Sequence, residues 1–187
     1  MEIVTTVRGD GGLTRADLEA MPDDGRRYEL IDGVIVVSAA PSPRHQRIVL
    51  RLAMLLHPAC PPDLEVFVAP LDVDLAPNSV VEPDVLVAQR SHLTSKDLAG
   101  PPVLAVEVLS SSTRGVDLML KKARYERAGC PSYWVVDPGD DQNPVSLVAW
   151  DLIDRAYVEV GSVSGGETFH ATRPFAFAVT PDSLLDG

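Results

Sequence analysis

Two acidic residues lie in or beside apolar segments of the chain. Glu107 stands within Val103–Leu109, whose other residues are all apolar, and Asp84 comes directly before the apolar run Val85–Val87. A carboxylate in an apolar strand is costly unless it is paired or binds a metal ion. For Glu107, a metal ligand and a salt-bridged glutamate are equally good interpretations. For Asp84 alone, a Pro-Asp turn before a strand is the favoured one.

Further candidates lie on predicted helices and on an earlier strand. Asp117, Lys121 and Tyr125 are spaced i, i+4 and i+8, so they share one helical face. Taken alone, the Asp–Lys pair is typical of an exposed helical ion pair worth about 0.2–0.5 kcal/mol. Glu29 lies in an early strand, and His45 heads the apolar stripe of a helix. A lone histidine in that position is more often a hydrogen-bonded structural residue than a ligand.

Taken together, these residues form a set typical of metal-dependent phosphodiesterases. It has two acids on separate strands, a third acid, and a lysine on the helix that follows the second acidic strand. Magnesium prefers oxygen ligands and usually takes one or two protein carboxylates. In phosphodiester hydrolysis a metal ion polarises the phosphate and generates hydroxide, and a further cation stabilises the developing charge.

The elements that position these residues follow from periodicity, caps and turns. In the first half of the chain we expect a short helix at Leu13–Met21 capped by Thr14, a hairpin at Tyr28–Val37 turning at Asp32-Gly33, a helix from Ser42-Pro43 to about Leu56, one or two strands in Leu64–Leu75, and a strand at Val80–Val87 interrupted by Pro83. His45 lies on the apolar stripe of the second helix and should point toward the sheet.

The second half begins with the segment that contains Glu107. Val103–Leu109 has the apolar pattern of a central strand, because both of its faces are buried. We then expect a helix from about Val116 to Ala128, a strand at Tyr133–Val136, β-strands within Val145–Val179, and a short helix opened by Thr180-Pro181. This order predicts an α/β or α+β fold with a mixed sheet.

Length and composition limit the classes of protein. The 187 residues, 45% of them hydrophobic, suit a single domain spanning 1–187. No apolar run reaches the roughly 18 residues needed to span a bilayer, and no secretory signal is visible. Cys60 and Cys130 form no CxxC motif, which favours a reducing, cytoplasmic setting. The net charge of −11 argues against tight nonspecific DNA binding.

Four segments carry a resemblance to a known family. They are YELIDGVIVV, PSPRHQRIVLRL, VEPDVLV and LAVEVLSSSTRGVDLMLKKARYERAGCPSYWVVDP, which together run from Tyr28 to Pro138. In them the chain resembles the Uma-type restriction endonucleases of the PD-(D/E)xK superfamily, which are common in bacteria. The resemblance implies a restriction-endonuclease-like mixed β-sheet flanked by helices, here with an extra C-terminal β-rich region.

The same resemblance assigns roles to single residues. Asp84 and Glu107 take the places of the two motif acids, and with the backbone carbonyl of Val108 they would bind Mg²⁺ or Mn²⁺. The usual lysine of the superfamily would fall at Leu109, so the resemblance gives its role to Lys121, which lies on the following helix. Glu29 matches an upstream catalytic acid. His45, Tyr125 and Asp117 are expected to support the site.

We also expect a particular orientation of the helix that carries Lys121. Lys121 should stand at the rim of the site and Lys122 should face solvent. The face formed by Met119, Leu120 and Ala123 should pack on the sheet.

Two functions remain open from the sequence. The first is a Mg²⁺- or Mn²⁺-dependent endonuclease that acts on nucleic acid, most readily DNA. The alternative is a non-catalytic protein on the same scaffold, acting as a partner-binding or regulatory module, which the acidic charge favours. Exposed strand edges in the C-terminal region predict a homodimer in either case.

Overall fold

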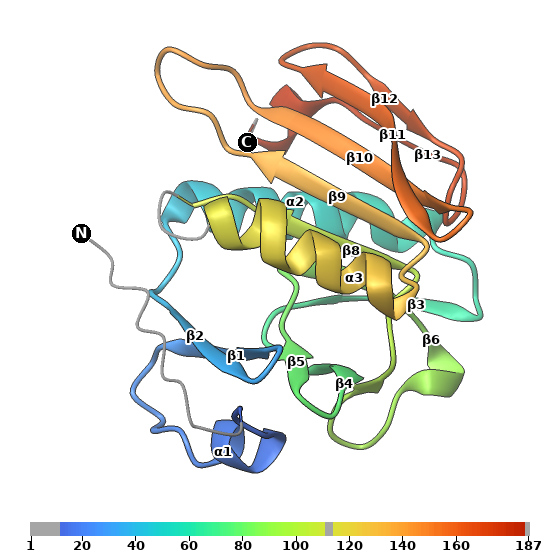
Figure 1. Cartoon of the computed structure of the whole chain (residues 1–187). Coiled ribbons are helices and arrows are strands. Elements are labelled where there is room, and N and C mark those ends of the chain that lie inside the picture. Colours follow the sequence, from blue (N-terminus) through green and yellow to red (C-terminus); the bar gives the residue numbers. More distant parts are fainter. Residues whose placement is uncertain (1–11, 111–113, 186–187) are drawn as a thin grey trace.

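The computed structural model describes residues 12–110 and 114–185 and contains a six-stranded, a five-stranded and a two-stranded sheet (Figure 1). The first half contains α1 (Arg15–Glu19), β1 (Arg27–Ile31), β2 (Val34–Ser38), α2 (Pro43–Ala59), β3 (Leu64–Val68), β4 (Val73–Ala76), β5 (Ser79–Val81), β6 (Val85–Gln89) and a 3₁₀ turn at Arg90–His92. The second half contains β7 (Leu98–Ala99), β8 (Leu104–Val108), a π-helical segment Val116–Lys121, α3 (Lys122–Ala128), β9 (Ser132–Asp137), β10 (Ser146–Ile153), β11 (Ala156–Ser164), β12 (Phe169–Ala171), β13 (Phe177–Val179) and a 3₁₀ turn at Pro181–Leu184.

The six-stranded sheet has the order β11-β10-β9-β8-β6-β3 and forms the centre of the molecule. Strand β8 pairs in parallel with β9 and antiparallel with β6, so the predicted central strand and mixed sheet are confirmed. Side chains alternate along β8: Val106 and Val108 join the core that contains α2, whereas Ala105 and Leu109 join the core that contains Tyr125 of α3. Helices therefore cover both faces of this sheet (Figure 1).

The five-stranded sheet has the order β2-β1-β5-β4-β7. Its β1–β2 hairpin turns at Asp32 and Gly33, whose φ angles are 50° and 78°. Positive φ at both central residues is the requirement of a type I′ turn, and an Asp-Gly pair meets it readily. The hairpin predicted from the sequence is confirmed, and it holds Glu29 in the middle of β1.

The expected single strand at Val80–Val87 is two strands in two different sheets. β5 ends at Val81 in the five-stranded sheet, and β6 begins at Val85 in the six-stranded sheet. Pro83 lies between them and has no N–H to donate to a ladder, so the chain leaves one sheet there and enters the other. The segment Glu82–Asp84 thus joins the two sheets and carries Asp84 at their junction.

The C-terminal strands partly extend the central sheet. β10 pairs with β9, and β11 pairs with β10 as the outer strand, so this part of the β-rich region is continuous with the predicted mixed sheet. β12 and β13 form the separate two-stranded sheet. Within the described ranges, no helix combines the length and the apolar character needed to cross a membrane.

Candidate functional site

Glu107 is fully buried on the face of the central sheet that α3 covers. Its two carboxylate oxygens each lie 3.1 Å from Nζ of Lys121, and Tyr125 donates a hydrogen bond of 3.3 Å to Oε1. Burial raises the pKa of Glu107 well above its usual value against the lowering effect of Lys121, and the charges of Asp117, Asp84 and Glu29 raise it further. The glutamate in the apolar strand is therefore paired, which the sequence left open.

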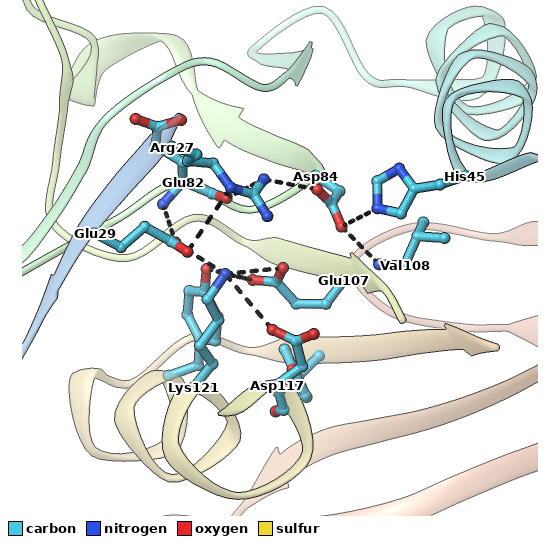
Figure 2. A network of polar contacts seen from close by, with 11 residues as sticks. Arg27, Glu29, His45, Glu82, Asp84, Glu107, Val108, Asp117 and Lys121 are labelled. Carbon is cyan, nitrogen blue, oxygen red and sulfur yellow. Dashed lines mark hydrogen bonds and ion pairs between the residues drawn. The ribbon is translucent and has the colours of Figure 1, made fainter. Parts of the chain in front are cut away.

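Lys121 lies between three carboxylates (Figure 2). Besides Glu107, its Nζ is 2.8 Å from Oε1 of Glu29 and 3.7 Å from Oδ1 of Asp117. Burial lowers the pKa of Lys121, but the charges of Glu107, Glu29 and Asp117 outweigh it and raise that pKa, so the ammonium is charged. Lys121 is only 1% exposed. The expectation of a rim position is wrong, because the buried acids draw the lysine into the interior.

The helical face that carries Lys121 is the buried one. Asp117, Lys121 and Tyr125 are all buried, as their shared face predicted. The expectation that Met119, Leu120 and Ala123 pack on the sheet is wrong. Met119 is 69% and Leu120 52% exposed, and Ala123 is exposed as well. The buried face combines the ion pairs of Lys121 with the apolar packing of Tyr125.

Lys122 also departs from its expected place. It is partly buried, and its Nζ lies 4.0 Å from the centroid of the Trp150 ring, as in a cation–π contact. A lysine stem commonly covers apolar surface while its ammonium stays near water. The two adjacent lysines therefore differ in kind: Lys121 belongs to a buried ion cluster and Lys122 to the outer surface of α3.

Asp84 lies just before β6, where the β6–β8 ladder ends. Its Oδ2 accepts a hydrogen bond of 2.8 Å from the backbone N–H of Val108 and lies 3.1 Å from Nε2 of His45. Its Oδ1 accepts a hydrogen bond of 2.8 Å from Nη1 of Arg27. Burial acts to raise the pKa of Asp84, but the bond with His45 and the charge of Arg27 outweigh it and lower that pKa. Asp84 is therefore ionised at neutral pH.

Arg27 and Glu29 connect the two acidic positions. They lie two residues apart on β1 and so point to the same side of the strand. Nε of Arg27 is 3.9 Å from Oε2 of Glu29, and Oε1 of Glu29 accepts a hydrogen bond of 2.7 Å from the backbone N–H of Glu82. Arg27 thus joins the part of the network around Asp84 to the part around Lys121 (Figure 2).

A cavity of about 1030 Å³ opens beside this network. Asp84, His45, Arg27 and Glu82 line it, but Glu107, Lys121 and Asp117 are not among its described lining residues. Within the described part of the chain, Nδ1 of His45 is buried and has no hydrogen-bond partner. Asp84 therefore meets the cavity directly, and Glu107 lies deeper.

Glu82 adds a further carboxylate at the cavity wall. Burial raises its pKa to about 7, and the nearby charge of Glu29 adds to this effect. Arg27 donates a long hydrogen bond of 3.4 Å to its backbone carbonyl. The carboxylate of Glu82 is thus close to its midpoint of titration at neutral pH.

The structure brings together the eight residues that the sequence singled out. They are Glu29, His45, Asp84, Glu107, Val108, Asp117, Lys121 and Tyr125. Sequence reasoning missed Arg27 and Glu82. Each lies two residues before an acid that was singled out, so the two-residue repeat of an extended chain could have found both.

The candidate ligands are mainly carboxylates, which suit a divalent cation. No group of three His, Cys, Asp or Glu side chains in the described ranges is arranged to hold an ion, but Mg²⁺ needs only one or two carboxylates beside water. The cluster has more acids (Glu29, Glu82, Asp84, Glu107 and Asp117) than fixed cations (Arg27 and Lys121). The N–H of Val108 points at Asp84, and in a strand the carbonyl of the same residue points to the same side.

A mixed sheet with helices on both faces and a cluster of acids and lysine beside its central strand defines a protein of the restriction-endonuclease-like fold. A solved structure of the same fold is that of a putative nuclease from Anabaena variabilis, with a TM-score of 0.72. The two chains share 17% sequence identity, and the match covers 92% of this chain and 97% of that one.

The chain belongs to the Uma2 family. The family model, described as "putative restriction endonuclease", matches residues 15–182 and therefore includes all three described sheets and every residue of the network. A search of curated proteins found no match.

Proposed function

We propose that the protein is a Mg²⁺- or Mn²⁺-dependent endonuclease that hydrolyses phosphodiester bonds of nucleic acid, with DNA as its substrate. One observation carries the proposal: Asp84 lies at the wall of the cavity with its carboxylate against the backbone of Val108, the residue next to Glu107. A carboxylate at a strand end, a buried acid on the adjacent strand and a larger number of acidic than of basic side chains in the cluster together suit a hard cation and a phosphate group. Membership of the Uma2 family supports the same reaction.

The ion would be held by Asp84, the carbonyl of Val108 and Glu107. When bound, a divalent ion supplies an activated water and polarises the phosphate. Lys121 is charged and bonded to Glu107, so it cannot accept a proton from water; it fixes the position of Glu107 and balances its charge. His45 orients Asp84 through its ring Nε2, which lies 3.1 Å from Oδ2.

The basic residues around the cavity support a phosphate-containing substrate. Arg26, Arg44, Lys96 and Arg114 line it together with Arg27. Acidic side chains line it in similar number, so attraction for a polyanion is local and moderate rather than general. We place the protein in the bacterial cytoplasm, where two free cysteines such as Cys60 and Cys130 are usual.

The test is a cleavage assay with Mn²⁺ on duplex DNA, single-stranded DNA and RNA. We expect duplex DNA to be cut by the wild type, with no cleavage when the metal is chelated. Glu107→Gln keeps the shape of the side chain and removes its charge, so activity should fall at least about 100-fold, a typical loss for a group that stabilises the transition state. Asp63→Asn, at an exposed acid between α2 and β3, is the control and should cut normally.

A second candidate is a non-catalytic, partner-binding protein on the same scaffold. The observation that favours it is that Glu107 and Asp84 already have cations beside them, in Lys121 and Arg27 respectively. This reading predicts no cleavage with any metal and no binding of Mn²⁺. Metal-dependent cleavage that is lost in Glu107→Gln would exclude it.

A further inference from the structure

Arg27 differs from the other cation of the network in its access to the cavity. Its side chain is 23% exposed and lines the cavity, whereas Lys121 is 1% exposed and is not among the described lining residues. Lys121 contacts three carboxylates at up to 3.7 Å. Arg27 is hydrogen-bonded to one carboxylate, that of Asp84, and lies 3.9 Å from that of Glu29. Of the two cations, Arg27 is therefore the one that the cavity exposes.

The oxygen that Arg27 covers is the one that a metal ion would need. Oδ2 of Asp84 is used by His45 and by the N–H of Val108. Oδ1 is the remaining oxygen, and Nη1 of Arg27 lies 2.8 Å from it. A guanidinium and a divalent ion at that oxygen would repel each other, because both would be cations in contact with one carboxylate oxygen. A metal ion at Oδ1 would therefore disfavour the present position of Arg27.

We propose that Arg27 is an exchangeable counter-cation with two positions. It neutralises Asp84 when no divalent ion is present, and it leaves that carboxylate when an ion is supplied. In its second position the guanidinium extends into the cavity and binds a phosphate of the substrate. This inference rests on the proposed function, and it adds a substrate-binding residue to it.

The chemistry of arginine suits both positions. A guanidinium remains charged at any physiological pH, and it binds carboxylate and phosphate through the same pair of parallel N–H donors. Removing it leaves Asp84 buried without its cation, which costs stability in the metal-free protein. The same removal frees Oδ1 for a metal ion. A variant that lacks the charge should therefore lose stability and gain metal affinity together.

The first experiment is calorimetric titration of Mn²⁺ into three proteins: wild type, Arg27→Gln and Arg26→Gln. Arg26 also lines the cavity, but it pairs with Asp24 rather than with Asp84, so it controls for general loss of positive charge. We expect Arg27→Gln to bind Mn²⁺ on the order of tenfold more tightly, as for removal of a competitor worth about 1.4 kcal/mol. Arg26→Gln should bind within about twofold of wild type.

The possible results test the exchange of Arg27 separately from the proposed nuclease function on which it rests. Equal or weaker binding by Arg27→Gln, with clear binding by wild type, overturns the exchange and leaves the proposed function standing. No binding by any of the three proteins overturns both. An equal gain in Arg26→Gln and Arg27→Gln also overturns the exchange, because general electrostatics would then explain it.

A second measurement uses only the wild-type protein, so it does not depend on the folding of a variant. In the wild type, the side-chain Nε–H signals of arginines are followed by NMR as Mg²⁺ is added. We expect the Arg27 signal to shift with the Mg²⁺ binding curve, while that of Arg155, on the β10–β11 turn, stays unchanged. An Arg27 signal that does not move while Mg²⁺ binds overturns the exchange.

The proposed contact between Arg27 and a substrate phosphate is tested separately. The affinity for a DNA duplex is measured at several salt concentrations, with Ca²⁺ as the divalent ion. Loss of one phosphate contact should lower the slope of log affinity against log salt by about 1 in Arg27→Gln. Arg155→Gln should keep the wild-type slope. An unchanged slope in Arg27→Gln removes the phosphate-binding position from the proposal.

Discussion

Nζ of Lys121 lies 2.8 Å from Oε1 of Glu29, and both side chains are only 1% exposed. Glu29 belongs to β1 of the five-stranded sheet, whereas Lys121 comes directly before α3 on the six-stranded sheet. The contact therefore holds the two sheets against each other as well as balancing the charge of Glu107. A lysine in this position is part of the folded core, and its replacement affects stability before it affects chemistry.

We predict that Lys121→Met destabilises the protein by about 3–5 kcal/mol, because it leaves Glu29, Glu107 and Asp117 buried without their cation. Urea unfolding at neutral pH measures the loss. Lys121→Ala should behave in the same way. A free energy of unfolding of Lys121→Met within about 1 kcal/mol of that of wild type would contradict the assignment of Lys121 to a buried ion cluster.

The neighbouring lysine provides the matched control. Lys122→Ala removes one cation–π contact with Trp150 at the surface and should cost about 0.5–1 kcal/mol. Its cleavage activity should equal that of wild type. A loss as large as that of Lys121→Met would show that the two lysines have been assigned the wrong roles.

We predict that Asp84→Asn weakens Mn²⁺ binding by about 10- to 100-fold, since a hard cation loses a carboxylate charge. The amide can retain a hydrogen bond to Val108, so the strand end should keep its shape. Calorimetry compares this variant with wild type and with Asp63→Asn, an exposed control. Equal affinity in all three proteins would remove Asp84 from the metal site.

The metal-free protein should lose stability as pH rises from about 4.5 to 7. The pKa of Glu82 is about 7 in the folded protein against 4.5 unfolded, because burial opposes its charge. Between these values the folded state binds more protons than the unfolded state, so the free energy of unfolding falls with rising pH. After allowance for partial exposure, the loss from this residue is about 1–2 kcal/mol.

Glu82→Gln isolates this contribution. The free energy of unfolding of the variant, relative to wild type, should rise between pH 5 and pH 8 by the same amount, as urea titrations at several pH values would measure. A constant difference across this range would show that Glu82 titrates normally.

We predict a homodimer formed through β11, the outer strand of the six-stranded sheet. Val158 and Val160 are 46% and 44% exposed, and an outer strand offers an edge on which a further strand can pair. Antiparallel pairing of a strand with its own copy is two-fold symmetric, as closed dimers require. Light scattering should give twice the monomer mass at micromolar concentration, and Val158→Lys should shift it toward monomer. A monomeric wild type would contradict the prediction.

Much of the fold follows from local sequence signals. Each such signal specifies only the element in which it lies, and each of these elements forms where expected. Examples are the Asp32-Gly33 turn, the cap at Ser42 and the apolar strand around Glu107. The split at Pro83 could not be predicted in full, because the residues on both sides are apolar and the pattern does not say which sheet each side joins. Pairing of strands depends on distant parts of the chain.

The site was predictable in its members but less so in its contacts. Asp117, Lys121 and Tyr125 share a face by helical spacing alone, but spacing does not say whether that face is buried. The answer depends on Glu29 and Glu107, which reach Lys121 from other elements and make its burial favourable. Arg27 was missed because an arginine at the start of a strand is common, and its partner Asp84 lies far along the chain, where the two sheets join.

Because the five-stranded and six-stranded sheets join at Glu82–Asp84, one of them can unfold locally while the other stays folded. Residues from both sheets meet there, with Glu29 supplied by the smaller sheet and Glu107 by the larger. Separation of the β1–β2 hairpin would break the contacts of Arg27 and of Glu29 at once, while the core between α2 and the central sheet stayed intact. We therefore expect amide protons of β1 to exchange with solvent through a local opening of this hairpin, at a lower free-energy cost than those of the central sheet, as hydrogen exchange would measure.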